Sequence, residues 1–353
     1  MKIFLYSDLH ISRTSSILPQ TSSNNLYTYR QDMILKTGEF LADIIKKENP
    51  DLIINLGDTF DQHTITSYDI DVASKFFKCF EQFNIPHFVL VGNHEMVNQN
   101  FNAIEILNNI NNITVISEPT TIDVNDLLNI NEKLKLGFLP YCNYKDIIMF
   151  PEASYLFSHQ DIQGATIRGD FKLPDGIEPN TLKDKYKLVF NGHIHKSSIL
   201  CNVINVGSIT THSFSDDENS IPQCYIFDTI TNDLKIFKST VCPLFRKFTI
   251  QKDINELYTY INSLDTQYKY ILHIICPFEI KEDVKKYLDD NSLIIANRLN
   301  VRISKKDVSL EETQTNLNLQ SNIDVKQSFK EFLNEVELKY PIDIYNNILN
   351  EVE

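Results

Sequence analysis

The sequence predicts an α/β protein built around a parallel sheet. Continuous apolar runs, which are typical of strands buried on both faces, cover residues 2–6, 52–56, 87–91, 155–157 and 187–190. Two segments with apolar residues at helical spacing, 30–47 and 68–83, lie between the first three runs. The first part of the chain therefore has the order β-α-β-α-β, which favours parallel strands joined by crossover helices.

Each apolar run is followed by a polar turn that contains acidic, amide or imidazole side chains. The five turns read Asp8-Leu9-His10, Gly57-Asp58-Thr59-Phe60-Asp61, Gly92-Asn93-His94-Glu95, Ser158-His159-Gln160 and Gly192-His193-Ile194-His195. In open α/β sheets the functional site lies beyond the carboxyl ends of the strands. We therefore expect the five turns to meet at one edge of the sheet.

Side chains of these kinds suit a pair of divalent cations. Two ions roughly 3.5–4 Å apart clamp phosphate oxygens and lower the pKa of a shared water, so that a phosphoester is attacked at neutral pH. Oxygen and imidazole donors without thiolate favour Mn²⁺, Fe²⁺ or Zn²⁺ in a catalytic site over a structural zinc. The turns therefore predict a two-metal phosphoesterase.

Each side chain then has an expected role. One carboxylate must bridge the two ions, and Asp58 in the second turn is the natural choice. The other ligands are expected in two sets, one for each ion, namely Asp8, His10 and His195, and Asn93, His159 and His193. His94 directly follows a ligand, so its ring is free to donate a proton to the leaving oxygen or to hold the phosphate.

These motifs resemble those of the calcineurin-like metallophosphoesterases, and within them the SbcD-type DNA nucleases, particularly the bacteriophage form. The nuclease resemblance rests on the N-terminal Asp-x-His, on Gly207-Ser208 after the last His pair, and on the C-terminal hundred residues. It implies a four-layer αββα β-sandwich core with a small α+β capping domain and C-terminal helices. It also implies that Asp61 is the acidic partner that orients His94.

The resemblance further implies a metal-dependent DNA nuclease with exonuclease and endonuclease activity in recombination, repair or replication. Nucleases of this type work with an SbcC-type coiled-coil ATPase. Mn²⁺ is the expected metal, with Mg²⁺, Fe²⁺ or Zn²⁺ as alternatives. The expected partners are therefore DNA and the ATPase, and the sequence leaves a homodimer open.

The chain after the last turn supplies the elements that this architecture needs. Further strands are predicted at residues 202–206, 225–227 and 234–237. The nuclease domain is expected to span residues 1–243, because Cys242-Pro243 restricts the backbone at its end.

A capping domain that contacts DNA is expected over residues 244–305. Its strands are predicted at 247–250, 268–275 and 300–303, and its helices at 254–264 and 280–289. A polar linker at 306–322 then leads to two amphipathic helices within residues 323–353. We expect this helical segment to bind the ATPase.

Composition sets further bounds on the protein. A chain of 353 residues with 42% hydrophobic residues can bury a full core. Its six cysteines have no paired spacing and are expected to be reduced. No apolar stretch approaches the roughly 18–20 residues of a membrane helix, and the first run is too short for a signal peptide. The protein is therefore expected in the cytoplasm, that of the host if a phage encodes it.

The formal net charge of −14 conflicts with free-standing DNA binding, which depends on Lys and Arg contacts to phosphates. Bound cations would make the site locally positive, and a partner ATPase would supply further DNA contacts. The alternative is a phosphodiesterase or phosphatase acting on a nucleotide, lipid or protein. A protein phosphatase of this superfamily would carry Asp-Arg-Gly where this chain has Gln62-His63. A non-catalytic scaffold would bind no metal.

The remaining polar residues of interest have ordinary interpretations. His63, His87, His212 and His273 match no motif position and are expected to be structural, with the alternative that His63 and His212 line the cleft. Glu95 is expected to hydrogen-bond within the site without binding metal.

Overall fold

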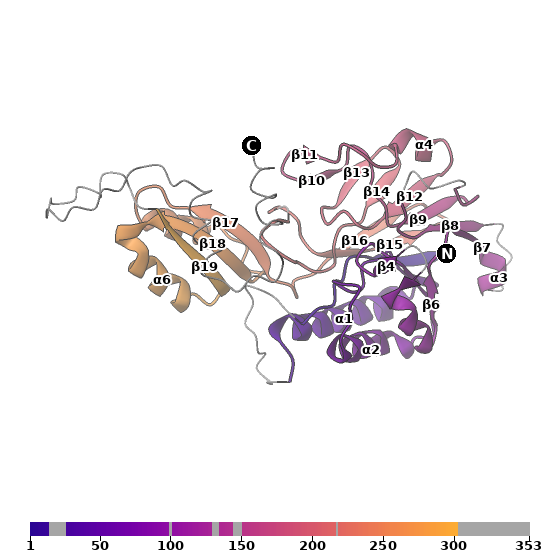
Figure 1. Cartoon of the computed structure of the whole chain (residues 1–353), viewed down its shortest axis with the longest axis horizontal. Coiled ribbons are helices and arrows are strands. Elements are labelled where there is room, and N and C mark those ends of the chain that lie inside the picture. Colours follow the sequence, from indigo (N-terminus) through magenta and orange to yellow (C-terminus); the bar gives the residue numbers. More distant parts are fainter. Residues whose placement is uncertain (14–25, 99–100, 129–133, 144–149, 217, 303–353) are drawn as a thin grey trace, which may run out of the picture. The chain divides into compact units, whose positions relative to one another are not determined.

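The computed structural model describes residues 1–13, 26–98, 101–128, 134–143, 150–216 and 218–302 (Figure 1). Met1–Ile303 forms one compact unit. The predicted linker (306–322) and the predicted partner-binding helices (323–353) lie outside the described residues. No helix in the described part is long and apolar enough to cross a membrane.

The first sheet has six strands in the order β16-β15-β1-β2-β3-β6. Four of them run parallel, namely β1 (Lys2–Tyr6), β2 (Leu52–Asn55), β3 (His87–Leu90) and β6 (Ile113–Ile116). Two antiparallel strands complete it, β15 (Gln223–Asp228) and β16 (Leu234–Lys238). The predicted parallel sheet at the start of the chain is confirmed.

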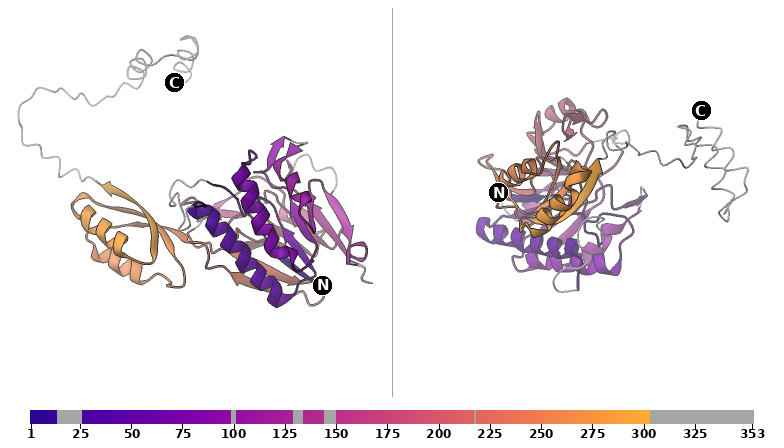
Figure 2. Two further views of the ribbon diagram at one scale, coloured as in Figure 1. Left: turned by 90° about the horizontal axis from the view of Figure 1, so that it is seen from below. Right: turned by 90° about the vertical axis from the view of Figure 1, so that its left-hand side faces the viewer.

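Two long helices connect the first three strands and lie side by side (Figure 2). They are α1 (Tyr29–Glu48) and α2 (Ser67–Glu81). Each begins with a capping box, in which Thr28 and Gln31, or Thr66 and Asp69, satisfy each other's backbone N–H groups. Between β3 and β6 the chain forms two very short strands, β4 (Met96–Asn98) and β5 (Phe101–Asn102), and the 3₁₀ helix η1 (Ala103–Asn109).

The second sheet also has six strands, in the order β13-β14-β12-β9-β8-β7. Its parallel strands are β8 (Lys135–Leu139), β9 (Tyr155–Ser158), β12 (Leu188–Asn191) and β14 (Val203–Asn205). Its antiparallel edge strands are β7 (Thr120–Asp123) and β13 (Ser198–Leu200). Two short helices, α3 (Val124–Leu128) and α4 (Pro179–Lys183), and the hairpin of β10 (Thr166–Arg168) and β11 (Phe171–Lys172) accompany this sheet.

Alternating side chains of each central strand enter two different cores. On β1, Ile3 and Leu5 pack against the second sheet, whereas Phe4 and Tyr6 pack against α1 and α2. On β12, Phe190 faces the first sheet, and Val189 packs beneath α4 and its neighbouring loops. The predicted four-layer αββα sandwich is therefore confirmed, with its second outer layer reduced to one short helix and loops.

A third sheet follows the sandwich and has a hydrophobic core of its own. Its strands are all parallel, β17 (Leu244–Thr249), β18 (Tyr270–Pro277) and β19 (Ile294–Arg302). The connections hold α5 (Asn255–Asn262), η3 (Phe278–Ile280) and α6 (Lys281–Asp290). The α+β order matches the expected capping domain, but the last strand begins at Ile294, and the predicted start at residue 300 was wrong. Ala296 and Asn297 are residues of low strand propensity, so the first half of this strand was missed in the sequence.

Candidate metal centre

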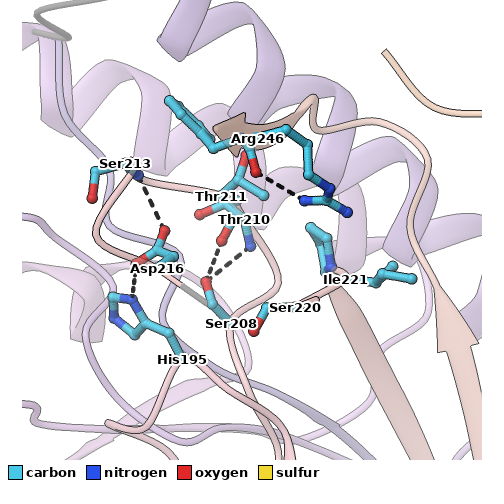
Figure 3. A pocket seen from close by; sticks show the side chains of 11 residues that line it. His195, Ser208, Thr210, Thr211, Ser213, Asp216, Ser220, Ile221 and Arg246 are labelled. Atoms are coloured by element: carbon cyan, nitrogen blue, oxygen red, sulfur yellow. Dashed lines mark hydrogen bonds and ion pairs between the residues drawn. The ribbon is translucent and has the colours of Figure 1, made fainter. Parts of the chain in front are cut away.

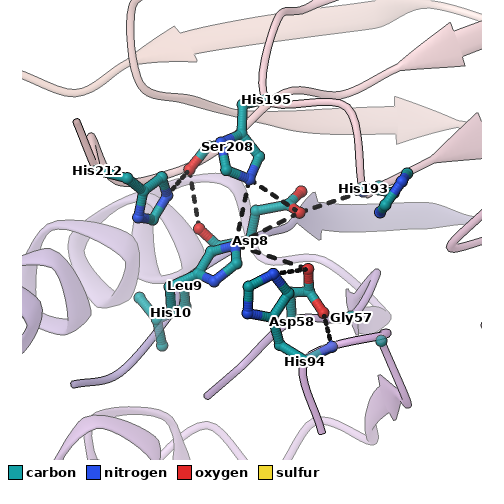
Figure 4. Close-up of polar contacts among 12 residues, drawn as sticks. Asp8, Leu9, His10, Gly57, Asp58, His94, His193, His195, Ser208 and His212 are labelled. Carbon is teal, nitrogen blue, oxygen red and sulfur yellow. Dashed lines mark hydrogen bonds and ion pairs between the residues drawn. The ribbon is translucent and has the colours of Figure 1, made fainter. Parts of the chain in front are cut away.

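The five polar turns meet at one place because each follows a strand of a parallel set. Turns one, two and three follow β1, β2 and β3, and turns four and five follow β9 and β12. Backbone hydrogen bonds join the first two turns, from Asp8 N to Gly57 O (3.1 Å) and from His10 N to Asp58 O (2.9 Å). Residues of four of the turns surround a common centre in Figure 4. The sequence prediction that the turns converge is thus met by the geometry.

The backbone of the turns is held in an unusual conformation. Four residues of the turns have a positive φ, in the left-handed region that residues other than glycine rarely adopt. They are Asp8 (54°), His10 (47°), Asp58 (50°) and His193 (71°). Gly92 cannot carry a side chain, because a Cβ atom there would lie 2.1 Å from Asp58 Oδ1. Strain of this kind persists only where the surrounding structure enforces it, and it concentrates at functional sites.

A first group of ligand atoms surrounds the gap between His10 and His195. Their Nε2 atoms lie 3.2 Å apart. Asp8 Oδ1 is 3.9 Å from His10 Nε2 and 3.8 Å from His195 Nε2. Asp58 Oδ2 lies 3.6 Å from His10 Nε2. The structure thus brings together the three residues predicted for one ion, together with the predicted bridging carboxylate.

A second group lies on the other side of Asp58. His193 Nδ1 is 2.8 Å from Asn93 Oδ1, and His159 Nε2 is 3.2 Å from the same oxygen. Asp58 Oδ2 lies 3.2 Å from His159 Nε2. The same carboxylate oxygen therefore faces both groups, which is the position that a bridging ligand must occupy.

The outer nitrogens of His159, His193 and His195 each donate a hydrogen bond, which fixes the orientation and the tautomer of these rings. His195 Nδ1 donates to Asp216 (3.1 Å), His193 Nε2 to Asp161 (3.0 Å), and His159 Nδ1 to the carbonyl of Leu56 (2.7 Å). His10 Nδ1 lies 3.3 Å from Asp61 Oδ1. Each inner nitrogen is therefore left with a lone pair that points into the centre.

These lone pairs make the residues a good fit for cations. His10 Nε2 faces His195 Nε2, and His193 Nδ1 faces the amide oxygen of Asn93, so acceptors meet acceptors at hydrogen-bond distance. Asp8 Oδ2 is buried and has no hydrogen-bond partner among the described residues. A buried arrangement of this kind needs protons or metal ions between its acceptors. Its oxygen and nitrogen donors suit Mn²⁺, Mg²⁺, Fe²⁺ or Zn²⁺.

Burial and neighbouring charges also shift the pKa values of the ligand side chains. Burial opposes a charge on His159, but the nearby Asp58 carboxylate outweighs it and raises the pKa of His159 to about 9. Burial likewise opposes a charge on His195, and its hydrogen bond to Asp216 still raises that pKa. Burial would raise the pKa of Asp58, but His159 holds it below its usual value. The Asp58 and Asp216 carboxylates therefore favour a positive charge on His159 and His195, whereas burial lowers the pKa of His10.

His94 lies beside the first group, with 38% of its side chain exposed. Its Nδ1 donates to the backbone carbonyl of Asp61 (2.7 Å), which leaves Nε2 facing the centre, 4.0 Å from Asp58 Oδ2. We expected the carboxylate of Asp61 to orient His94, and this expectation needs correction. The carboxylate instead lies 3.3 Å from His10 Nδ1, and it is the backbone carbonyl of Asp61 that accepts from His94.

Glu95 is buried and joins two turns from within. Its carboxylate accepts from Phe60 N (2.8 Å) and Gly92 N (2.7 Å), so it holds the second and third turns together without facing either group of ligand atoms. Burial and the nearby Asp58 raise the pKa of Glu95 to about 8. Glu95 thus acts within the site as expected.

The structure adds residues that the motifs did not reveal. His212, which we expected to be an ordinary structural residue, lies with its ring 4.3 Å from that of His10 and 4.6 Å from that of His195. Asp161 and Asp216 orient His193 and His195. Asp161 stands two positions after His159 and gave a recognisable signal, whereas Asp216 follows no motif.

A small pocket lies directly behind the His195–Asp216 pair (Figure 3). Its polar lining includes Ser208, Ser213 and the guanidinium-bearing side chain of Arg246 from β17. Ser220 Oγ is buried there without a hydrogen-bond partner among the described residues. The pocket places hydroxyl groups and one cation next to the metal centre.

Residues 1–197 match the family model of calcineurin-like phosphoesterases. The chain belongs to the calcineurin-like phosphoesterase family. This phosphoesterase is 26% identical over 290 residues to exonuclease subunit 1 of Enterobacteria phage T4, a match that covers 79% of this chain and 75% of the relative.

Solved structures of the same kind also resemble the phosphoesterase. An archaeal phosphodiesterase is 17% identical, with a TM-score of 0.35, and the match covers 68% of this chain and all of that one. The phosphoesterase Yfce from E. coli is 12% identical, with a TM-score of 0.33, over 67% of this chain and 98% of that one.

Proposed function

We propose that this phosphoesterase is a two-metal DNA nuclease that hydrolyses phosphodiester bonds. The observation that carries the proposal is the position of Asp58 Oδ2, which faces His10 in one ligand group and His159 in the other. The name of the T4 relative, an exonuclease subunit, supports a nucleic acid as the substrate. The resemblance of the motifs to SbcD-type nucleases supports DNA, with exonuclease and endonuclease activity in recombination, repair or replication in the cytoplasm, that of the host if a phage encodes the protein.

The chain's own residues prepare the site for an anionic substrate. When bound, two divalent ions would neutralise the phosphodiester and lower the pKa of a water. Asp58 would bridge them, with Asp8, His10 and His195 on one side and Asn93, His159 and His193 on the other. Because the outer nitrogens of His159, His193 and His195 are already hydrogen-bonded, the inner nitrogens of these rings need little reorganisation to bind cations. We propose Mn²⁺ as the metal.

His94 is the proposed proton donor to the leaving oxygen. Its Nδ1 must carry hydrogen, because a backbone carbonyl accepts from it. Nε2 is then the nitrogen that gains or loses a proton, and it faces the centre from an exposed ring. An exposed donor beside Asp58 is well placed to protonate the departing 3′-oxygen of DNA.

A second candidate function is the hydrolysis of a nucleotide, lipid or protein phosphoester. The net charge of −14 favours it, because DNA binding depends on cationic contacts. The DNA proposal answers this with the bound cations, with Arg246 beside the centre, and with a partner of the SbcC type. That partner, an ATPase bound through residues 323–353, stays a prediction.

The decisive experiment incubates the purified protein with linear double-stranded DNA and Mn²⁺, with and without EDTA. Mn²⁺-dependent release of nucleotides would support the proposal. A chromogenic phosphodiester serves as a matched substrate without DNA. Hydrolysis of that compound with no cleavage of DNA, even with the SbcC-type ATPase present, would favour the second candidate.

The partner is tested separately by deleting residues 323–353. We expect the shortened protein to hydrolyse the chromogenic phosphodiester at the normal rate but to lose co-purification with the ATPase. Unchanged co-purification would place the ATPase-binding surface elsewhere on the chain.

A further inference from the structure

Arg30, the second residue of α1, buries its guanidinium group next to the metal centre. The residue is 5% exposed. Its NH1 group donates to the carbonyl of Thr211 (2.6 Å). Its NH2 group lies within hydrogen-bond distance of four acceptors from two distant segments, which are Leu9 O (3.2 Å), His10 O (3.0 Å), Thr210 Oγ1 (3.2 Å) and His212 Nδ1 (3.1 Å).

These partners are all uncharged. No carboxylate lies within 4 Å of the Arg30 guanidinium in the described part of the chain. A buried cation is costly without compensation; here the direct hydrogen bonds all go to neutral acceptors, and the carboxylates of Asp61 and Asp216 act on the charge only from a greater distance. The arrangement therefore serves to hold backbone segments in place and is not an ordinary ion pair.

The segments that it holds are the first turn and residues 208–212. Arg30 and two hydroxyl groups together satisfy the backbone carbonyls of the whole first turn. Ser208 Oγ donates to Asp8 O (2.8 Å), Thr210 Oγ1 to Leu9 O (3.0 Å), and Arg30 to His10 O. Figure 4 shows Ser208 between His212 and the first turn.

His212 links these donors in a fixed direction. Because a guanidinium group only donates, His212 Nδ1 must accept, and Nε2 of the neutral ring then carries the hydrogen. Nε2 donates to Ser208 Oγ (2.9 Å). Both nitrogens of His212 are thus occupied, so the ring packs beside His10 and His195 as a wall and is not a further ligand.

We propose that Arg30, with Ser208, Thr210 and His212, forms a clamp that holds the first turn in its strained, left-handed conformation and so positions Asp8 and His10 for the first ion. The inference rests on the proposed two-metal function. Arg30 touches neither ligand side chain in this role, so it is a positioning residue. The second group of ligands, with Asn93, His159 and His193, receives no hydrogen bond from the clamp.

Geometry, and not charge, makes arginine necessary at this position. The planar guanidinium reaches Thr211 O with one nitrogen and the first turn with the other. The single ammonium of a lysine cannot serve both. Arg30→Lys should therefore weaken binding of one ion although it keeps the positive charge.

The test measures Mn²⁺ binding by calorimetry and by electron paramagnetic resonance, where a coupled ion pair and an isolated ion give different spectra. For Arg30→Lys we expect one ion to bind with unchanged affinity and the other about ten- to a hundredfold more weakly. Arg298→Lys, at an exposed position on β19, is the matched control and should keep the pair. Thr210→Val, which removes a single donor, gives a milder second variant should Arg30→Lys fold poorly.

Double variants identify which ion is affected. Added to His195→Ala, which already disables the first group, Arg30→Lys should change Mn²⁺ binding no further. Added to His193→Ala, it should remove most of the remaining binding. Loss of both ions in Arg30→Lys alone, or full retention of the pair in both Arg30→Lys and Thr210→Val, would overturn the clamp.

The outcomes also separate the clamp from the proposed function. A wild-type protein that binds an Mn²⁺ pair but leaves DNA intact would refute the nuclease and leave the clamp standing. A nuclease in which both clamp variants keep the pair would refute the clamp alone. A wild-type protein that binds no Mn²⁺ pair would refute both.

Discussion

Buried histidines occur in two different regions of this protein. His87, 2% exposed, packs against the rings of Phe77 and Phe80 under α2 and hydrogen-bonds to the hydroxyl of Tyr6 (3.0 Å), and burial lowers its pKa to about 3. His159 is completely buried at the metal centre, yet the pKa of its ring is raised to about 9 by Asp58 in spite of burial. Burial without a nearby carboxylate therefore leaves His87 neutral, whereas the Asp58 carboxylate favours a positive charge on His159.

Removing the Asp58 carboxylate should make His159 resemble His87, a buried histidine with no charged partner. Asp58→Asn keeps a residue that tolerates the left-handed backbone but removes the charge facing both ligand groups. We expect loss of the Mn²⁺ pair and a fall of about a thousandfold in hydrolysis of a chromogenic phosphodiester. Calorimetry and initial rates measure the two effects. A variant that keeps both ions would contradict the assignment of Asp58 as the bridge.

His94 is expected to take part in catalysis without binding a metal ion, unlike the ligand histidines. His94→Ala removes the proposed proton donor, so we expect kcat for DNA cleavage to fall about a hundredfold while both ions stay bound. His10→Ala is the matched comparison and should lose the first ion. If His94→Ala also releases an ion, its ring is a ligand, and the proposed role is incorrect.

Substitutions in the hydrogen-bond partners of the ligand histidines should have smaller effects, each on the affinity of one Mn²⁺ ion. Asp61→Asn weakens the partner of His10, and Asp161→Asn weakens the partner of His193. Each should lower the affinity of one Mn²⁺ ion by about tenfold and leave the other unchanged. The double variant should weaken both ions. Equal weakening of both ions by Asp61→Asn alone would show that the groups do not act separately.

The core histidine predicts a pH effect on stability. The folded pKa of His87 is depressed to about 3, so the unfolded chain binds the extra proton, and stability is lost as the pH falls below about 6.5. Between pH 8 and pH 5 this costs about 2 kcal/mol in the free energy of unfolding. Chemical denaturation in EDTA should show a shallower decline for His87→Gln than for the wild type. Parallel curves would contradict the neutral state of His87.

The strands and the turns could be predicted from the sequence because both leave local sequence patterns. Apolar runs marked the central strands, and the chemistry-bearing residues followed each run directly. Asp161 was also within reach, as a carboxylate two positions after His159. The αββα layering came from the family resemblance and is confirmed by the two packed sheets.

The clamp, and the acceptors of the outer histidine nitrogens, could not be predicted from the sequence, because they depend on contacts between distant segments. Arg30 and His212 are 182 residues apart, and neither lies in a motif. His212 was taken for an ordinary residue for this reason. The role of the Asp61 carboxylate was also misjudged, because residue spacing does not show whether the side chain or the backbone carbonyl of Asp61 faces His94.

The first sheet also determines when the protein becomes functional during its synthesis. His10 and His195 are separated by 185 residues, and β1 pairs on one side with β15, which ends at Asp228. A ribosome must therefore translate about two thirds of the chain before the first ligand group can close. Until then Asp8 and His10 lack His195, so the first ligand group stays incomplete until the later strands have been synthesised.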